Sequence, residues 1–252
     1  MSFDLVLLIV AGFLGGMLNA VAGGGTFITF PALVFTGVPP IAANASSTVA
    51  ALPGYLASAI GFRRDLARLD RAVVVRLTWL TLLGGATGSV LLLVSSSKAF
   101  SLLVPFLLLI ATLVFVFAAQ VRAFASRFRG GVAAFGAGTM IPVAIYGGYF
   151  NGGLGIILLA LFSLWGMTDL HEMNGLKTWL SFALSLISAA IFAAGGQIVW
   201  VECLVMSVGT ILGGFLGAPA ARLIPMPALR GLIAVVGFGM TAAFFWRLIN
   251  GA

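Results

Sequence analysis

Long apolar runs separated by short polar or glycine-rich stretches are the dominant pattern of this sequence. A membrane-spanning helix needs about 20 mostly apolar residues. Runs near this length cover residues 5–22, 72–94, 100–119, 132–150, 199–221 and 228–249. Two shorter runs cover residues 26–36 and 156–166, and two further helices are expected to end near residues 61 and 194. The pattern predicts an all-α polytopic membrane protein with eight to ten membrane segments, depending on whether the short runs cross the membrane or are re-entrant.

The composition agrees with a multi-pass location in the cell (inner) membrane. Of the 252 residues, 62% are hydrophobic and 8% are charged, whereas soluble proteins have about 45–50% apolar and about 25% charged residues. The net charge of +7 would suit nucleic-acid binding, but the basic residues gather in short loops, mainly 62–71 and 120–131. Such loops orient membrane proteins, with the positive side in the cytoplasm. We therefore expect the lipid bilayer, and no nucleic acid, as a partner.

Few residues are suited to metal binding or to catalysis. The chain has one cysteine, Cys203, and one histidine, His171, so no metal-ligand spacing is present and we expect neither metal nor cofactor. A serine hydrolase needs a base and the G-x-S-x-G elbow, which this sequence lacks. The residues therefore argue against an enzyme.

Two glycine-rich stretches interrupt apolar runs where a membrane helix should continue. Residues 15–25 read GGMLNAVAGGG and residues 147–155 read GGYFNGGLG. Unwound backbone inside a membrane is tolerated only where it is buried in protein or lines a cavity. Breaks at matching places in two halves of a chain are the best sequence indication of a transporter's substrate site.

The two halves of the chain match each other when one is shifted by about 130 residues. At an offset of 129, TLLGGATG (81–88) matches TILGGFLG (210–217) at five of eight positions. We interpret residues 1–130 and 131–252 as two homologous transmembrane repeats that form one integrated membrane domain. The counterpart of the basic loop 62–71 has no Lys or Arg, whereas the counterpart of SSSK (95–98) has two Arg. This exchange of charge predicts an inverted repeat, with an odd number of crossings in each half.

The glycine motifs and their flanks resemble the sulfite exporter TauE/SafE family, also called the toluene-sulfonate uptake permease family. The resemblance lies in GGMLNAVAGGGTFITFPAL and PPIAANASSTVAALPG of the first half, and in GGYFNGGLGIILLAL and LHEMNGLKTW of the second. It covers essentially the whole chain. It implies a secondary transporter of a small sulfur-containing anion such as sulfite, sulfoacetate or another organosulfonate, without fixing the anion or the direction. From the paired breaks we expect alternating access, and we take export as the expected direction.

Lys177 is the first candidate for the substrate site. An ionisable residue inside a membrane is rare and costly, so it indicates function, although a lysine at this place can also extend to the interface or pair with Glu172 or Asp169. The repeat places it opposite Ser47, which predicts an anion site with one cationic and one hydroxyl half. The other candidates are polar residues at expected helix starts, which offer N–H groups to anions or simply cap the helix, and residues of the glycine breaks. The predicted substrate-binding set is Asn19, Gly23, Gly24, Gly25, Asn44, Ser46, Ser47, Thr48, Asn151, Gly153, Asn174, Lys177 and Thr178.

Several alternatives stay open at this point. His171 and Glu172 form a candidate pair for coupling to a proton, since His titrates near neutral pH, but a solvated loop pair explains them as well. The coupling ion is thus a proton or another cation. A carrier or channel for another small anion, and a membrane subunit without transport of its own, are the competing functions. The glycine-rich faces suit a homodimer, although they suit packing within one chain equally.

Overall fold

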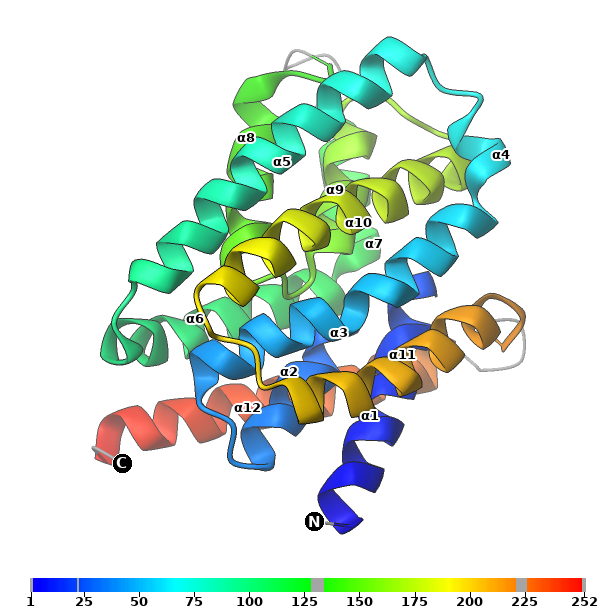
Figure 1. Cartoon of the computed structure of the whole chain (residues 1–252). Coiled ribbons are helices and arrows are strands. Elements are labelled where there is room, and N and C mark those ends of the chain that lie inside the picture. Colours follow the sequence, from blue (N-terminus) through cyan, green and yellow to red (C-terminus); the bar gives the residue numbers. More distant parts are fainter. Residues whose placement is uncertain (1, 22, 128–133, 221–225, 251–252) are drawn as a thin grey trace.

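The computed structural model describes residues 2–21, 23–127, 134–220 and 226–250. Within them the elements are all helices, joined by turns and short irregular connections (Figure 1). The helices, in chain order, are α1 (Ser2–Val21), α2 (Thr26–Phe35), α3 (Pro40–Gly61), α4 (Arg63–Leu66), α5 (Arg71–Val94), α6 (Ser97–Val116), α7 (Ala118–Arg127), α8 (Ala137–Tyr149), α9 (Leu154–Leu164), α10 (Leu170–Ala194), α11 (Trp200–Ala220) and α12 (Met226–Asn250). The predicted apolar runs are confirmed as helices whose ends differ from the prediction by a few residues.

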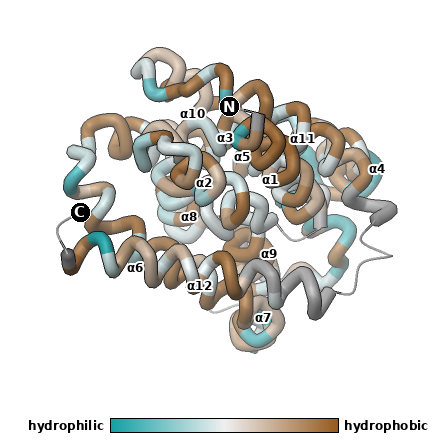
Figure 2. The backbone as a smooth tube through the Cα atoms, turned by 90° about the horizontal axis from the view of Figure 1, so that it is seen from below, coloured by the Kyte–Doolittle hydropathy of each residue, from teal (hydrophilic) through white to brown (hydrophobic). Residues whose placement is uncertain are grey.

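Four helices are long and apolar enough to cross a membrane, within the described residues: Phe3–Ala20 of α1, α5, α6 and α10. Shorter apolar helices are α2, α9 and stretches of α11 and α12. Large apolar side chains such as Phe215, Trp246 and Val94 are more than two-thirds exposed, and Figure 2 shows apolar residues along most of the helical tubes. An outer surface of this kind suits contact with lipid and not with water.

Each main contact between a helix of one half and a helix of the other half has a matching contact between their counterparts. The helix α1 packs along α11, and its counterpart α8 packs along α5; α3 contacts α11, and its counterpart α10 contacts α5. Two pairs, α3 with α10 and α6 with α12, each join a helix to its own counterpart. In Figure 1, α3 and α10 run side by side through the middle of the molecule. A duplicated chain predicts such an exchange, while the boundary near residue 130 and the inversion relative to the membrane stay predictions.

The duplicated TLLGGATG and TILGGFLG segments make equivalent close contacts in the two halves. A Cβ added at Gly84 of α5 would lie 2.5 Å from Cβ of Ala144 in α8. A Cβ added at Gly213 of α11 would overlap the carbonyl oxygen of Phe13 in α1. Small residues at these positions let helix backbones approach closely, which drives helix association in membranes.

Two local expectations are wrong. The basic stretch 120–131 was expected to be a loop, but its described part belongs to α7, because residues 118–127 contain no Gly or Pro and are mostly good helix formers. The polar group from Asn44 to Thr48 was expected to cap a helix, but α3 begins at Pro40 with Pro39 as its N-cap. Proline is favoured in the first helical turn, where its missing N–H costs nothing, so the polar group lies inside the helix.

Candidate functional site

Asn19 fixes the first glycine break, between α1 and α2. Its Oδ1 accepts a hydrogen bond from the backbone N–H of Gly25 at 2.7 Å and another from the hydroxyl of Tyr55 at 3.3 Å. Asn19 is 3% exposed, and a Cβ at Gly25 would overlap the carbonyl oxygen of Gly15. The amide oxygen of Asn19 therefore holds the unwound backbone in place.

The second break, between α8 and α9, is held by a different residue: the hydroxyl of Tyr146 in α8 donates to the backbone carbonyl oxygen of Gly152. Gly153 begins α9 in the left-handed conformation, with φ of 71°. Asn151 also has a positive φ, 61°, and is 1% exposed. Neither its Oδ1 nor its Nδ2 has a hydrogen-bond partner among the described residues. A buried polar group without a partner costs about 1–3 kcal/mol, so this amide requires an explanation.

The two breaks touch each other at the centre of the molecule. A Cβ added at Gly23 would lie 2.5 Å from Cα of Gly155, and one added at Gly155 would lie 2.6 Å from Cα of Gly23. Gly23 has φ of 81°, so it needs both the conformation and the space that only glycine allows. Gly24 packs on the ring of Phe115 in α6. The structure thus brings together stretches that are more than a hundred residues apart in the sequence.

The helix α3 contributes polar side chains to both halves of this centre. Asn44 Nδ2 donates to the carbonyl oxygen of Tyr149, at the end of α8, at 2.9 Å, while its Oδ1 is buried without a partner among the described residues. Ser47 Oγ lies 2.6 Å from Oγ1 of Thr29 in α2. Ser46 instead accepts a bond from the N–H of Val199, and Thr48 donates to its own helix backbone at Asn44. Asn44 and Ser47 therefore have the stronger case as site residues.

Lys177 lies fully buried in α10, next to the contact between the breaks. Its Cδ is 3.2 Å from the position of a Cβ on Gly155, and its exposed fraction is 0%. Its Nζ donates to Oδ1 of Asn174 at 2.8 Å. Within the described part of the chain, no carboxylate oxygen lies within 4 Å of Nζ. The predicted alternatives, an interface lysine or a pair with Glu172 or Asp169, do not fit this burial and this neutral partner.

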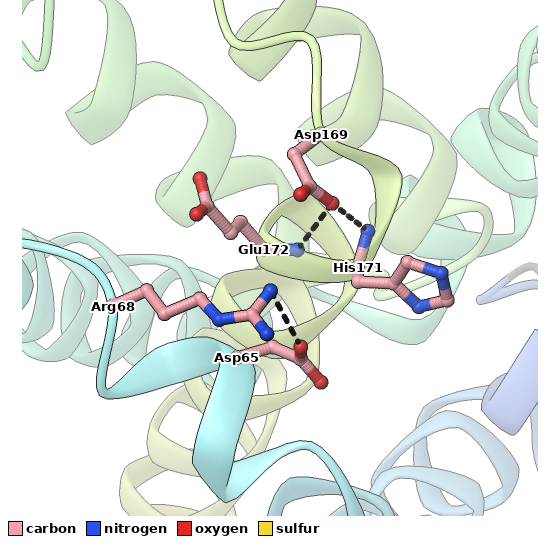
Figure 3. Close-up of polar contacts among 5 residues, drawn as sticks. All are labelled: Asp65, Arg68, Asp169, His171 and Glu172. Carbon is pink, nitrogen blue, oxygen red and sulfur yellow. Dashed lines mark hydrogen bonds and ion pairs between the residues drawn. The ribbon is translucent and has the colours of Figure 1, made fainter.

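The other polar residues around the first turn of α10 cap the helix or lie at its surface. Asp169 is the N-cap, and its Oδ1 accepts from the N–H groups of His171 and Glu172 at 2.7 and 3.3 Å (Figure 3). These bonds lower the pKa of Asp169 below its usual value. His171 is exposed and Glu172 half-buried, and the nearby Arg68 pairs with Asp65 at 3.5 Å (Figure 3). Coupling through His171 and Glu172 stays a prediction.

Asn174 and Thr178 do not cap α10, because the helix begins at Leu170. Asn174 lies in its second turn and holds Lys177, whereas Thr178 donates to the carbonyl oxygens of Asn174 and Gly175. Four buried polar residues near the centre were not anticipated from the sequence: Thr29, Tyr55, Ser181 and Ser185. The two serines could have been found from the sequence, because they follow Lys177 by four and eight residues and therefore lie on the same helix face.

Comparison with known proteins now adds to this geometry. The family model described as "Sulfite exporter TauE/SafE" matches residues 8–244. The chain belongs to this family. A protein of Haemophilus influenzae named probable membrane transporter protein is 33% identical over 94% of this chain and 93% of its own length. The probable membrane transporter proteins YfcA of Escherichia coli K12 and ORF9 of a Sinorhizobium species are 27% and 25% identical, over 89% and 90% of their own lengths. No solved structure matches.

The family match gives the class of protein to which the chain belongs. As a TauE/SafE protein with several apolar helices, the chain is a multi-pass membrane protein of a transporter family. Its paired breaks have the arrangement by which transporters form a site near the middle of the membrane.

Proposed function

We propose that this protein is a secondary transporter that exports a small sulfur-containing anion, such as sulfite or sulfoacetate, across the cell inner membrane. The family description "Sulfite exporter" and the names of the relatives, probable membrane transporters, support the class of function. The choice of an anion rests on the chemistry of the buried centre.

The observation that carries the proposal is the burial of Lys177 beside the contact between Gly23 and Gly155. An uncompensated charge in the interior costs several kcal/mol, and the neutral amide of Asn174 does not offset it. An anion next to Nζ would supply the missing opposite charge. Because hydroxyl and amide groups form the rest of the centre, the anion would be held by one charge and several neutral groups, which favours release as well as binding.

Alternating access follows from the same arrangement. The site would lie between the two halves, where α3 of one half contacts α10 of the other. Rocking of one repeat against the other around a fixed site would open it first to one side of the membrane and then to the other.

Thermal stabilisation of the purified protein in detergent tests the anion site. The panel contains sulfite, sulfoacetate, isethionate, thiosulfate, sulfate and chloride, each added to the wild type, Lys177→Met and Lys98→Met. A ligand at 100 times its Kd stabilises the native state by about 2.7 kcal/mol. We expect a rise in Tm with a sulfur oxyanion for the wild type and for Lys98→Met, whose side chain is exposed, and no rise for Lys177→Met.

Transport by the same proteins in liposomes separates a carrier from a channel. A carrier should show saturable uptake of labelled sulfite and exchange it for unlabelled sulfite inside the vesicle. Conductance that does not saturate would indicate a channel. An equal thermal response in Lys177→Met and the wild type would remove Lys177 from the site, and no response to any anion would refute the proposed substrate class.

A further inference from the structure

The helix α10 carries a buried polar stripe that extends well beyond Lys177. Asn174, Lys177, Ser181, Ser185 and Ser188 follow one another at intervals of three or four residues, so they share one helix face. The last four are at most 1% exposed. From residue 174 to residue 188 is 14 residues, or about 21 Å along the axis.

Two hydroxyls of this stripe lack the partners that serine and threonine find elsewhere in the protein. Buried Thr48, Thr81 and Ser163 each donate to the carbonyl oxygen four residues earlier in their own helix, which is the usual outcome. Ser188 accepts a bond from Ser89 of α5 at 2.8 Å. Oγ of Ser181 and Oγ of Ser185 are buried and have no partner among the described residues.

Comparison of the two halves explains why Ser185 and Asn151 are both unpaired. Asn19 and Asn151 are each the fifth residue of their GG-x-x-N motif, and Tyr55 corresponds to Ser185 at an offset of 130. In the first half, the Tyr55 hydroxyl donates to Oδ1 of Asn19. In the second half, a short serine replaces the tyrosine, and neither Ser185 nor Asn151 has a partner among the described residues. The hydrogen bond that joins Tyr55 to Asn19 in the first half therefore has no equivalent between Ser185 and Asn151 in the second.

We propose that Asn151 and Ser185, with Ser181 one turn before Ser185 in α10, form a neutral hydrogen-bonding subsite for the oxygen atoms of the transported anion. The inference rests on the proposed function and adds residues and an asymmetry to it. Nδ2 of Asn151 and the two hydroxyls are donors, and sulfonate or sulfite oxygens are acceptors. The second half, which also supplies Lys177 where the first half has Ser47, contributes these additional ligands. In the first half, the corresponding place is closed by the bond between Tyr55 and Asn19.

Binding of sulfite and sulfoacetate to the purified full chain, measured together with Tm in the absence of anion, tests this subsite. The variants are Asn151→Gly, Ser185→Ala and Ser185→Tyr, with Ser188→Ala as the control because its hydroxyl already pairs with Ser89. We expect Asn151→Gly to raise Tm without anion, since it removes a positive φ in a non-glycine residue and an unpaired amide. We also expect it to weaken anion binding about tenfold, which corresponds to about 1.4 kcal/mol.

The serine variants separate the subsite from a packing role. Ser185→Ala should bind the anion about tenfold more weakly with no loss of Tm, since it removes an unpaired hydroxyl. Ser185→Tyr, by recreating the pair of the first half, should abolish binding. Ser188→Ala should bind like the wild type. If Asn151→Gly and Ser185→Ala bind like the wild type while Lys177→Met does not, the subsite is refuted and the proposed function stands. If the wild type itself binds neither anion, both are refuted.

Discussion

Gly23 and Gly155 lie backbone against backbone, so that neither position has room for a Cβ. The contact joins the first glycine break to Gly155, the last residue of the second glycine-rich stretch, in the first turn of α9. The buried side chain of Lys177 lies against it. Two interruptions that would each be costly in a membrane are therefore buried against each other, which is the condition under which unwound backbone is tolerated there.

Gly23→Ala should lower the stability of the protein more than Gly37→Ala does. Gly37 has φ of 90° and nothing within 4 Å of an added Cβ, so its substitution measures the cost of the backbone conformation alone, about 1–2 kcal/mol. Gly23 combines φ of 81° with the overlap on Gly155. Thermal unfolding in detergent should show the larger loss for Gly23→Ala, together with loss of transport. Equal losses in the two variants would show that the breaks separate easily.

Asn19 and Tyr55 should be energetically coupled. Tyr55→Phe removes one donor and should cost about 1 kcal/mol, whereas Asn19→Leu also leaves the N–H of Gly25 without its acceptor and should cost about 1–3 kcal/mol more. In the double variant the losses should not add, because the Tyr55 hydroxyl donates to the oxygen that Asn19→Leu removes. The check is a double-mutant cycle on the free energy of unfolding. Additive losses would mean that the 3.3 Å contact contributes nothing.

The close packing of α1 on α11 gives a third prediction. Gly213→Ala places a methyl group on the carbonyl oxygen of Phe13, whereas Gly239→Ala, in α12, meets nothing within 4 Å. We expect Gly213→Ala to separate the two helices and to lower Tm and the yield of monodisperse protein. Gly239→Ala should leave both unchanged. A Gly213→Ala protein as stable as the wild type would argue that the helices shift at little cost.

Local signals in the sequence were sufficient to predict the helices and the two breaks. Apolar length predicted the spans, and Asn with several Gly marked the unwound places. The start of α3 was misjudged although Pro39 and Pro40 indicated it, because the polar residues from Asn44 onward resemble caps. Where two signals for a helix start compete, as the prolines and the later polar residues do here, the start is predicted correctly only if the stronger signal is recognised.

Contacts between distant residues could not be predicted in this way. Nothing local to Gly23 or Gly155 says that they touch, since 132 positions separate them in the sequence. Tyr55 looks like an ordinary core aromatic until the structure places its hydroxyl on Asn19. The missing partners of Asn151 and Ser185 emerge only when each buried polar atom is examined in three dimensions. Lys177, in contrast, could be named as a candidate site residue from the sequence, because a charged residue within an apolar segment is informative even when its neighbours are unknown.

The predicted inversion of the repeats makes a further prediction, namely on which side of the membrane each basic segment lies. With ten crossings, Arg64 and Arg122 face the cytoplasm and Lys98 faces outward. Cysteines placed one at a time at these positions, in a Cys203→Ser background, can be labelled in intact cells with a membrane-impermeant maleimide. Positions 64 and 98 are exposed and position 122 is half-buried. Cys203 is buried, so the background should stay unlabelled. We expect label at position 98 only, and at positions 64 and 122 only after the cells are opened. Label at 64 without label at 122 would place the two basic segments on opposite sides, which would contradict the predicted number of crossings between them.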